Sequence, residues 1–151
     1  MTLIAYSDPP RPLIGALKIL KYDIATLEEL AIPVRPDSEL MAGLLRTPHR
    51  VLVTMDTGIP SQAYLYRYAQ AGLTVVLLRW KTRTPRDLQE MAVAILTHGS
   101  AWEALAAREP GIISVSRSGW RHRAWSRIPA TIEESARSRF GEPHPGPDHE
   151  P

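Results

Sequence analysis

The chain contains no cysteine. That absence excludes disulfides, thiolate metal sites and cysteine nucleophiles, and it fits a cytoplasmic protein, which is our expectation. No apolar run approaches the roughly 18–20 residues that a membrane-spanning helix needs. Residues 1–12 also lack the basic start and long apolar stretch of a signal peptide. The sequence therefore predicts a globular protein without a membrane partner.

Several common catalytic signatures are missing as well. The chain has no glycine-rich phosphate-binding loop and no histidine pair at the spacing of two metal ligands on one helix. The segment "SRSG" at 116–119 lacks the flanking residues of a nucleophile elbow. These absences leave acidic and basic side chains as the main candidates for chemistry.

The 151 residues carry a formal net charge of +2 that is unevenly spread. Three acids, Glu142, Asp148 and Glu150, follow the last arginine, so the rest of the chain is more basic than the total indicates. Six arginines fall between Arg117 and Arg139. Such a basic surface is compatible with a nucleic-acid or phosphate partner, and equally with arginines that are only solvated.

Buried-strand patterns and helical patterns alternate along the chain. We expect strands over residues 2–6, 22–27, 50–54 and 73–79, and a hairpin over 111–125 that turns at Ser118 and Gly119. We expect helices over 13–20, 36–46 and 60–72, followed by a helix pair over 84–99 and 100–109. This alternation predicts an α/β fold with a mostly parallel sheet and helices on both of its faces.

Acidic residues stand where two of the predicted strands end. Asp8 follows the first strand and Asp56 follows the strand over 50–54, while Asp37 and Glu39 begin the helix that leads into that second strand. Ligands of open α/β sheets bind beyond the carboxyl ends of the strands. Carboxylates that converge there need a cation to offset their repulsion, and oxygen ligands of this kind suit Mg²⁺ or Mn²⁺. The pattern thus indicates a metal site at one edge of the sheet.

Each of these acids also has a purely structural interpretation. Asp8 can cap the turn in "SDPP", and Asp56 can form an Asx turn. Asp37 can be a helix N-cap, and Glu39 a first-turn acid that the helix dipole favours. Spacing alone does not decide between the two interpretations.

The order of these motifs resembles the PIN-like nuclease families, especially short proteins akin to the VapC toxins of toxin–antitoxin modules. Those families open with a strand, "DENLPP" and a helix, and later carry a strand "VLVTRD", a helix and a strand "V.VLL". The matching pieces here are "LIAYSDPPRPLIGALKILKYDIATLEEL", "PDSELMAGLLRTPHRVLVTMDTGI" and "AGLTVVLLRWKTRTPRDLQEMAVAIL". The segment "REPGIISVSRSGWRHR" is similar to the ending of some members, so the resemblance covers residues 2–124.

The resemblance implies a three-layer αβα sandwich and a Mg²⁺- or Mn²⁺-dependent endoribonuclease. It implies a PIN-like domain over 1–128. After this domain we expect a terminal helix over 129–140 and a disordered tail over 141–151. The protein would be the toxin of a toxin–antitoxin module, with RNA as its substrate and with an antitoxin protein and a second copy of the chain as candidate partners.

Carried over by position, the resemblance also assigns roles to individual residues. It implies that the metal is held by Asp8, Asp37 and Asp56, with Glu39 in support. Asp8 takes the place of the first aspartate only with a short deletion in the opening loop, and without it Tyr6 falls there. The acid that often follows "TRD" is replaced by Gly58.

Other charged residues have two interpretations each. Asp87 is either a fourth acid of the site or a first-turn residue of its helix. If the family geometry holds, RNA phosphates are contacted by Arg79, Lys81 and Arg83. The alternative is that these three residues form only an exposed basic loop. Two alternatives to the nuclease stay open: a PIN-like binding or regulatory module without catalysis, and an α/β domain unrelated to nucleases.

Overall fold

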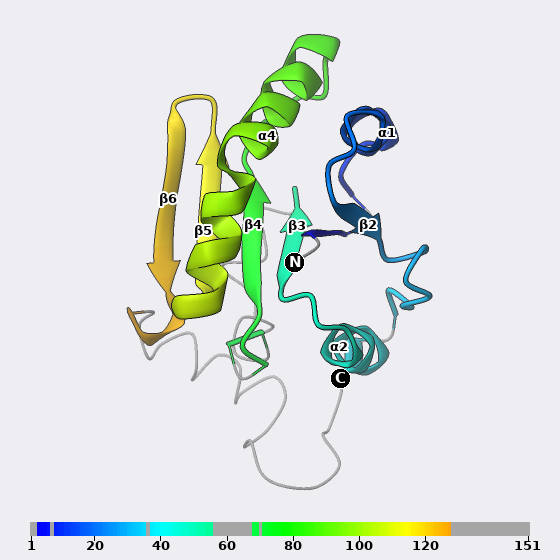
Figure 1. Cartoon of the computed structure of the whole chain (residues 1–151), viewed down its shortest axis with the longest axis vertical. Helices are drawn as coiled ribbons and strands as arrows, with labels where there is room; N and C mark the ends of the chain where they lie inside the picture. The colour runs from blue at the N-terminus through cyan, green and yellow to red at the C-terminus, as the bar shows by residue number, and fades with distance from the viewer. Residues whose placement is uncertain (1–2, 7, 36, 56–67, 70, 128–151) are drawn as a thin grey trace, which may run out of the picture.

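A computed structural model provides the structure of the chain and describes residues 3–6, 8–35, 37–55, 68–69 and 71–127 (Figure 1). The terminal helix and the tail expected after residue 128 lie outside the described residues, as does most of the helix expected over 60–72.

Six strands form one sheet in the order β2-β1-β3-β4-β5-β6. They are β1 (Leu3–Ala5), β2 (Ile24–Thr26), β3 (Val51–Thr54), β4 (Thr74–Leu78), β5 (Gly111–Ser116) and β6 (Gly119–Ala124). The first five are parallel, and β6 pairs with β5 in the antiparallel sense. The expectation of an α/β fold with a mostly parallel sheet is confirmed.

Helices cover both faces of this sheet, which is compatible with a three-layer sandwich (Figure 1). Successive strand residues point to opposite faces. Val51 and Val53 of β3 therefore pack with α1 (Arg11–Ile19) and α4 (Pro85–Arg108), while Leu52 packs with α2 (Asp37–Arg46). Burial on both faces explains why these strands are continuous apolar runs rather than alternating ones.

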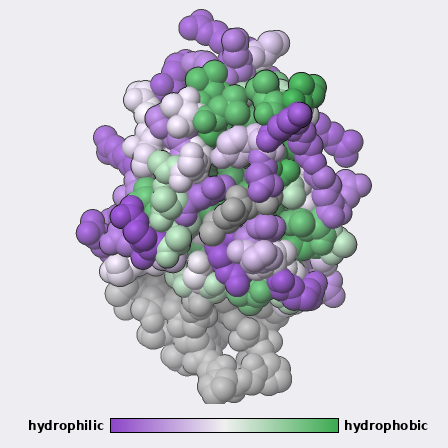
Figure 2. Space-filling view, in the orientation of Figure 1, coloured by the Kyte–Doolittle hydropathy of each residue, from purple (hydrophilic) through white to green (hydrophobic). Residues whose placement is uncertain are grey.

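The helix α1 begins at Arg11, two residues before the expected start. Pro12 lies in its first turn. Backbone N–H groups in the first turn have no acceptor within the helix, so a proline there, which has no N–H, costs no helix hydrogen bond. The outer surfaces of α1 and α4 carry apolar side chains, and Figure 2 shows apolar surface over both helices. The exposed large apolar residues there are Ile19, Leu20, Val93 and Leu96.

The expected helix pair over 84–109 is wrong, because α4 is one continuous helix of 24 residues. Gly99 and Ser100 carry the signals of a helix end and a new helix start, yet neither interrupts the helix. The reason is tertiary: a Cβ at Gly99 would lie 1.8 Å from the hydroxyl oxygen of Tyr22, so glycine is needed for the close approach of that side chain.

The predicted hairpin is confirmed, with a turn displaced by one residue. Ser116 pairs with Gly119, so the two turn residues are Arg117 and Ser118 rather than Ser118 and Gly119. Gly119 has a φ of 141°, which favours glycine and suits the exit from a tight turn.

Candidate functional site

The strand order changes direction between β1 and β3. From β1 the chain crosses to β2 on one side, and from β3 it continues through β4 and β5 on the other. In open parallel sheets, ligands bind beyond the carboxyl ends of the strands at such a switch point. The crevice outside Ala5 and Thr54, where β1 and β3 end, is therefore the first place to look for a site.

Asp8 lies at this switch point and is hydrogen-bonded to the end of β3. The Thr54 hydroxyl lies 3.0 Å from Oδ1 and 2.8 Å from Oδ2 of Asp8, and the Met55 N–H donates to Oδ1 at 3.1 Å. The Tyr6 N–H continues the strand pairing by donating to the Val53 carbonyl at 2.9 Å. The loop after β1 is thus attached to β3 directly before Asp56 in the sequence.

The remaining predicted metal ligands are less fully described. Glu39 is exposed in the first turn of α2, and Asp37 is the first residue of that helix. Asp56 lies outside the described residues, as does the side chain of Asp37. Among the residues that the structure describes, no three His, Asp or Glu side chains form a group that could hold a metal ion.

A basic, polar cavity lies further along the same edge, at the carboxyl ends of β4 and β5. Two hollows of about 460 and 380 Å³ share Arg79, Ser116 and Ser118 in their walls. Lys81 lines the first hollow and Arg121 the second. Because β3 and β4 are parallel neighbours, this cavity opens at the edge where Asp8 lies.

Of the three basic residues predicted to contact RNA, two line this cavity. Arg79 and Lys81 are exposed and contribute to its walls. Arg83 is exposed too, but it is not one of the lining residues. The structure adds Arg117 and Arg121 from the β5–β6 hairpin, which sequence reasoning had grouped only as part of a basic stretch.

Asp87 is confirmed as a first-turn residue of α4. It forms a capping box with Thr84, whose hydroxyl accepts from the Asp87 N–H at 3.2 Å while the Thr84 N–H donates to the carboxylate at 3.1 Å. The Thr82 hydroxyl also donates to Asp87, and Arg117 donates to its other oxygen at 3.0 Å. The hydrogen bond from Thr82 first, and then those from Thr84 and the nearby Arg117, hold the pKa of Asp87 below its usual value. All these contacts stabilise the charged carboxylate within its own helix cap.

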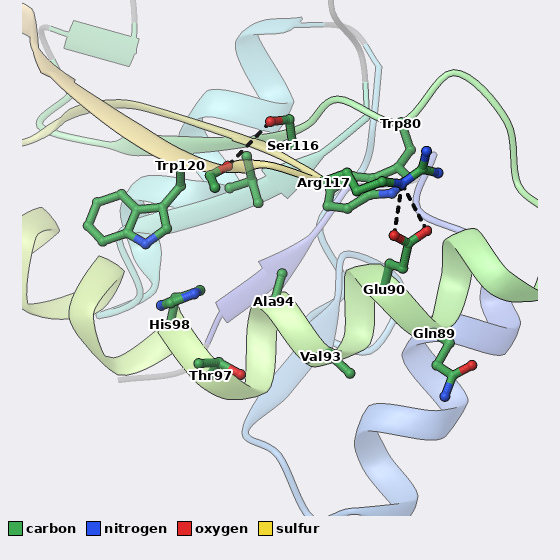
Figure 3. Close-up of a pocket in the computed structure, with 12 residues that line it drawn as sticks. Trp80, Gln89, Glu90, Val93, Ala94, Thr97, His98, Ser116, Arg117 and Trp120 are labelled. Atoms are coloured by element: carbon green, nitrogen blue, oxygen red, sulfur yellow. Dashed lines mark hydrogen bonds and ion pairs between the residues drawn. The ribbon is translucent and has the colours of Figure 1, made fainter.

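Arg117 joins the hairpin to α4 through two carboxylates. Its Nε donates to both oxygens of Glu90, at 2.8 and 3.1 Å (Figure 3). Its Nη2 donates to Asp87. A groove of about 480 Å³ runs from this pair along α4, and at its other end the rings of His98 and Trp120 have centroids 6.1 Å apart. The short turn after β5 is therefore fixed against α4, and this fixes the serine-lined wall of the basic cavity.

Comparison of the chain with protein-family models, with curated protein sequences and with solved structures gave no match. None of the described helices combines the length and apolar character needed to cross a membrane.

Proposed function

We propose that this protein is a Mg²⁺- or Mn²⁺-dependent endoribonuclease with a PIN-like fold. The observation that carries the proposal is the position of Asp8, hydrogen-bonded to Thr54 and Met55 at the switch point of the sheet. Met55 directly precedes Asp56, the acid that best matches the nuclease motif. In support, Asp8 contacts the last described residues before Asp56, at the edge where α/β proteins bind ligands.

The metal would be held by Asp8, Asp37 and Asp56, with Glu39, in the first turn of α2, in a supporting role. A bound divalent ion would supply Lewis-acid activation of water and of the phosphate. The Thr54 hydroxyl and the Met55 N–H orient the Asp8 carboxylate, as partners of a metal-binding side chain typically do. Both carboxylate oxygens of Asp8 retain lone pairs for a further ligand.

The basic cavity supports RNA as the substrate. Arg79, Lys81 and Arg121 can neutralise backbone phosphates along the edge of the sheet. Cations so placed would guide a polyanion past Asp8 without selecting a sequence. A role as the toxin of a toxin–antitoxin module, with an antitoxin partner and a homodimeric state, is part of the same proposal and rests on the resemblance alone.

The test is RNA cleavage by the purified full chain with Mn²⁺, with Mg²⁺ and with EDTA. We expect metal-dependent cleavage that Asp8→Asn and Asp56→Asn each slow by about a hundredfold or more, since each would remove a charge on which the metal depends. Glu109→Gln is the matched control, because Glu109 is exposed at the opposite edge of the sheet, just before β5. Cleavage that persists in EDTA, or that survives Asp56→Asn, would contradict the proposal.

One observation favours the alternative of a binding module without catalysis. Three hydrogen-bond contacts already give the Asp8 carboxylate a structural role, which is to attach the loop after β1 to β3. In that case the wild-type chain binds RNA through the basic cavity and cleaves none with either metal. The Asp8→Asn variant is then less stable than the wild type but binds RNA equally well.

A further inference from the structure

A separate cavity of about 620 Å³ lies at the carboxyl ends of β1 and β2, between α1 and the chain that follows β2. Small-molecule sites typically have volumes of roughly 300–1,000 Å³ and mostly apolar walls. The walls here fit that description, since they include Pro9, Ile14, Leu27, Ile32 and Val34. None of the acids of the ribonuclease proposal lines this cavity.

The outer wall of the cavity is a turn that internal hydrogen bonds hold in place. Glu29 accepts hydrogen bonds from the N–H and the hydroxyl of Thr26, both at 3.1 Å, and from the ammonium group of Lys18 on α1. The hydrogen bond from Lys18, followed by those from Thr26, lowers the pKa of Glu29. The Ile32 N–H then closes the turn by donating to the Leu27 carbonyl at 2.9 Å. The cavity is therefore bounded by ordered structure on both sides.

Gly15 forms part of the opposite wall, on α1. Glycine in a helix costs about 1 kcal/mol relative to alanine, so it normally has a reason in packing or in backbone conformation. Neither applies here: a Cβ on Gly15 would meet no described atom within 4 Å, and Gly15 is not among the described residues with positive φ. A bare backbone facing an open cavity instead leaves room for a flat group to approach the helix.

One cation at the opening, Arg11 of α1, is available to an anion, and one acid, Glu28, lies in the turn that forms the outer wall. Three charged residues line the cavity: Arg11, Lys18 and Glu28. Lys18 is already paired with Glu29. Arg11 is exposed and forms no ion pair with any residue that the structure describes, so its guanidinium can receive a carboxylate or phosphate group.

We propose that this cavity binds a small planar aromatic anion, with its ring against Gly15 and the apolar wall and its negative group on Arg11. This site is distinct from the proposed ribonuclease site and does not depend on it. Its ligand is defined by shape and charge: a flat apolar body and one acidic group.

The experiment titrates the isotope-labelled full chain with 2-naphthoate and follows the backbone amide signals by NMR. We expect saturable shifts at Ala5, Gly15, Thr26 and Leu27, and weaker binding of the neutral 2-naphthamide, which has the same shape without the charge. Arg11→Gln should weaken naphthoate binding roughly fivefold and leave naphthamide binding unchanged. No saturable shift, or shifts confined to the groove at His98 and Trp120, would overturn the proposal.

Gly15→Leu tests the position of the ring. Leucine is a better helix former than glycine, and its Cβ would meet no described atom within 4 Å, so the variant should fold with an equal or higher melting temperature. It should nevertheless abolish binding of both naphthalene compounds, because its side chain occupies the place of the ring against the helix. Gly15→Ala, which adds only one methyl group, should retain binding. Unchanged naphthoate affinity in Gly15→Leu would contradict this location.

Discussion

The hydroxyl of Thr54 lies within 3.0 Å of both carboxylate oxygens of Asp8, and the side chain of Thr54 is fully buried. This contact joins the loop after β1 to the last residue of β3, so the two neighbouring strands that flank the switch point are linked by side chains as well as by backbone pairing. The candidate site is therefore built on the central strands of the sheet rather than on a free loop.

Replacing Thr54 by valine tests this link. Thr54→Val keeps the shape of the side chain but removes the donor to Asp8, and we expect a loss of about 1–2 kcal/mol in the free energy of unfolding. Thr54→Ser retains the hydroxyl and should retain the hydrogen bond. Denaturant unfolding of the three proteins measures the difference, and equal stabilities of the valine and wild-type chains would show that the contact contributes nothing.

Gly99 and Gly15 provide a matched pair of helix glycines with opposite expected behaviour. Gly99→Ala should destabilise the chain by about 1 kcal/mol or more, because the new methyl group would meet the Tyr22 hydroxyl at 1.8 Å. Gly15→Ala should instead stabilise it by roughly 0.5–1 kcal/mol through helix propensity. Thermal unfolding compares the two.

The phenol of Tyr22 supplies a second measurement on Gly99→Ala. Burial, with smaller contributions from Glu103 and Asp23, raises the pKa of Tyr22 to about 12. If the new methyl group displaces Tyr22 toward solvent, its phenol should ionise closer to the ordinary value of 10.0, which the ultraviolet absorbance of the phenolate reports. A melting temperature raised in both glycine variants would contradict the close approach of Tyr22.

The lowered pKa of Asp87 predicts a loss of stability in acid. Because its pKa in the folded chain is lower than in the unfolded chain, the unfolded chain takes up the proton first as the pH falls. The contribution of Asp87 should be complete above the ordinary value of 3.8 and should disappear as the pH falls through the lower folded-state value. Asp87→Asn should therefore be less stable than the wild type at neutral pH and lose less stability on acidification. Parallel stability–pH curves for the two proteins would argue against it, and Glu109→Gln serves as the control.

The basic cavity predicts how RNA binding depends on salt. Arg79→Gln and Lys81→Gln should each weaken binding of single-stranded RNA and lower the slope of log affinity against log salt by about 0.7. Arg108→Gln should change neither, because Arg108 is exposed at the end of α4, at the opposite edge of the sheet. Fluorescence anisotropy at several salt concentrations measures all four proteins. A slope that falls equally in all three variants would indicate general charge attraction rather than a site.

The parts of the fold that could be predicted from sequence depend on local patterns. The run "TVVLL" of β4 is long and apolar enough to indicate a strand buried on both faces, and the structure confirms it. The break expected at Gly99 was wrong because glycine there serves the close approach of Tyr22, which comes from a distant part of the sequence, and does not end the helix.

The candidate site likewise has one part that local sequence patterns predict and another part that only tertiary contacts create. The place of Asp8 at a strand end could be predicted from the preceding apolar run. Its partner Thr54 could not, because that contact depends on the register between β1 and β3. The same holds for Arg117, whose two carboxylate partners on α4 are brought to it only when the hairpin folds against that helix.

The most direct test of the account is where Mn²⁺ binds. Mn²⁺ is paramagnetic and broadens the amide signals of nearby residues, so it can be titrated into the isotope-labelled full chain and followed by NMR. The account predicts that Ala5, Thr54 and Met55 broaden first, that Gly111 and Ala124 at the opposite edge stay sharp, and that Asp56→Asn removes the effect. Broadening that is absent, uniform, or unchanged in Asp56→Asn would contradict a metal site at the carboxyl ends of β1 and β3.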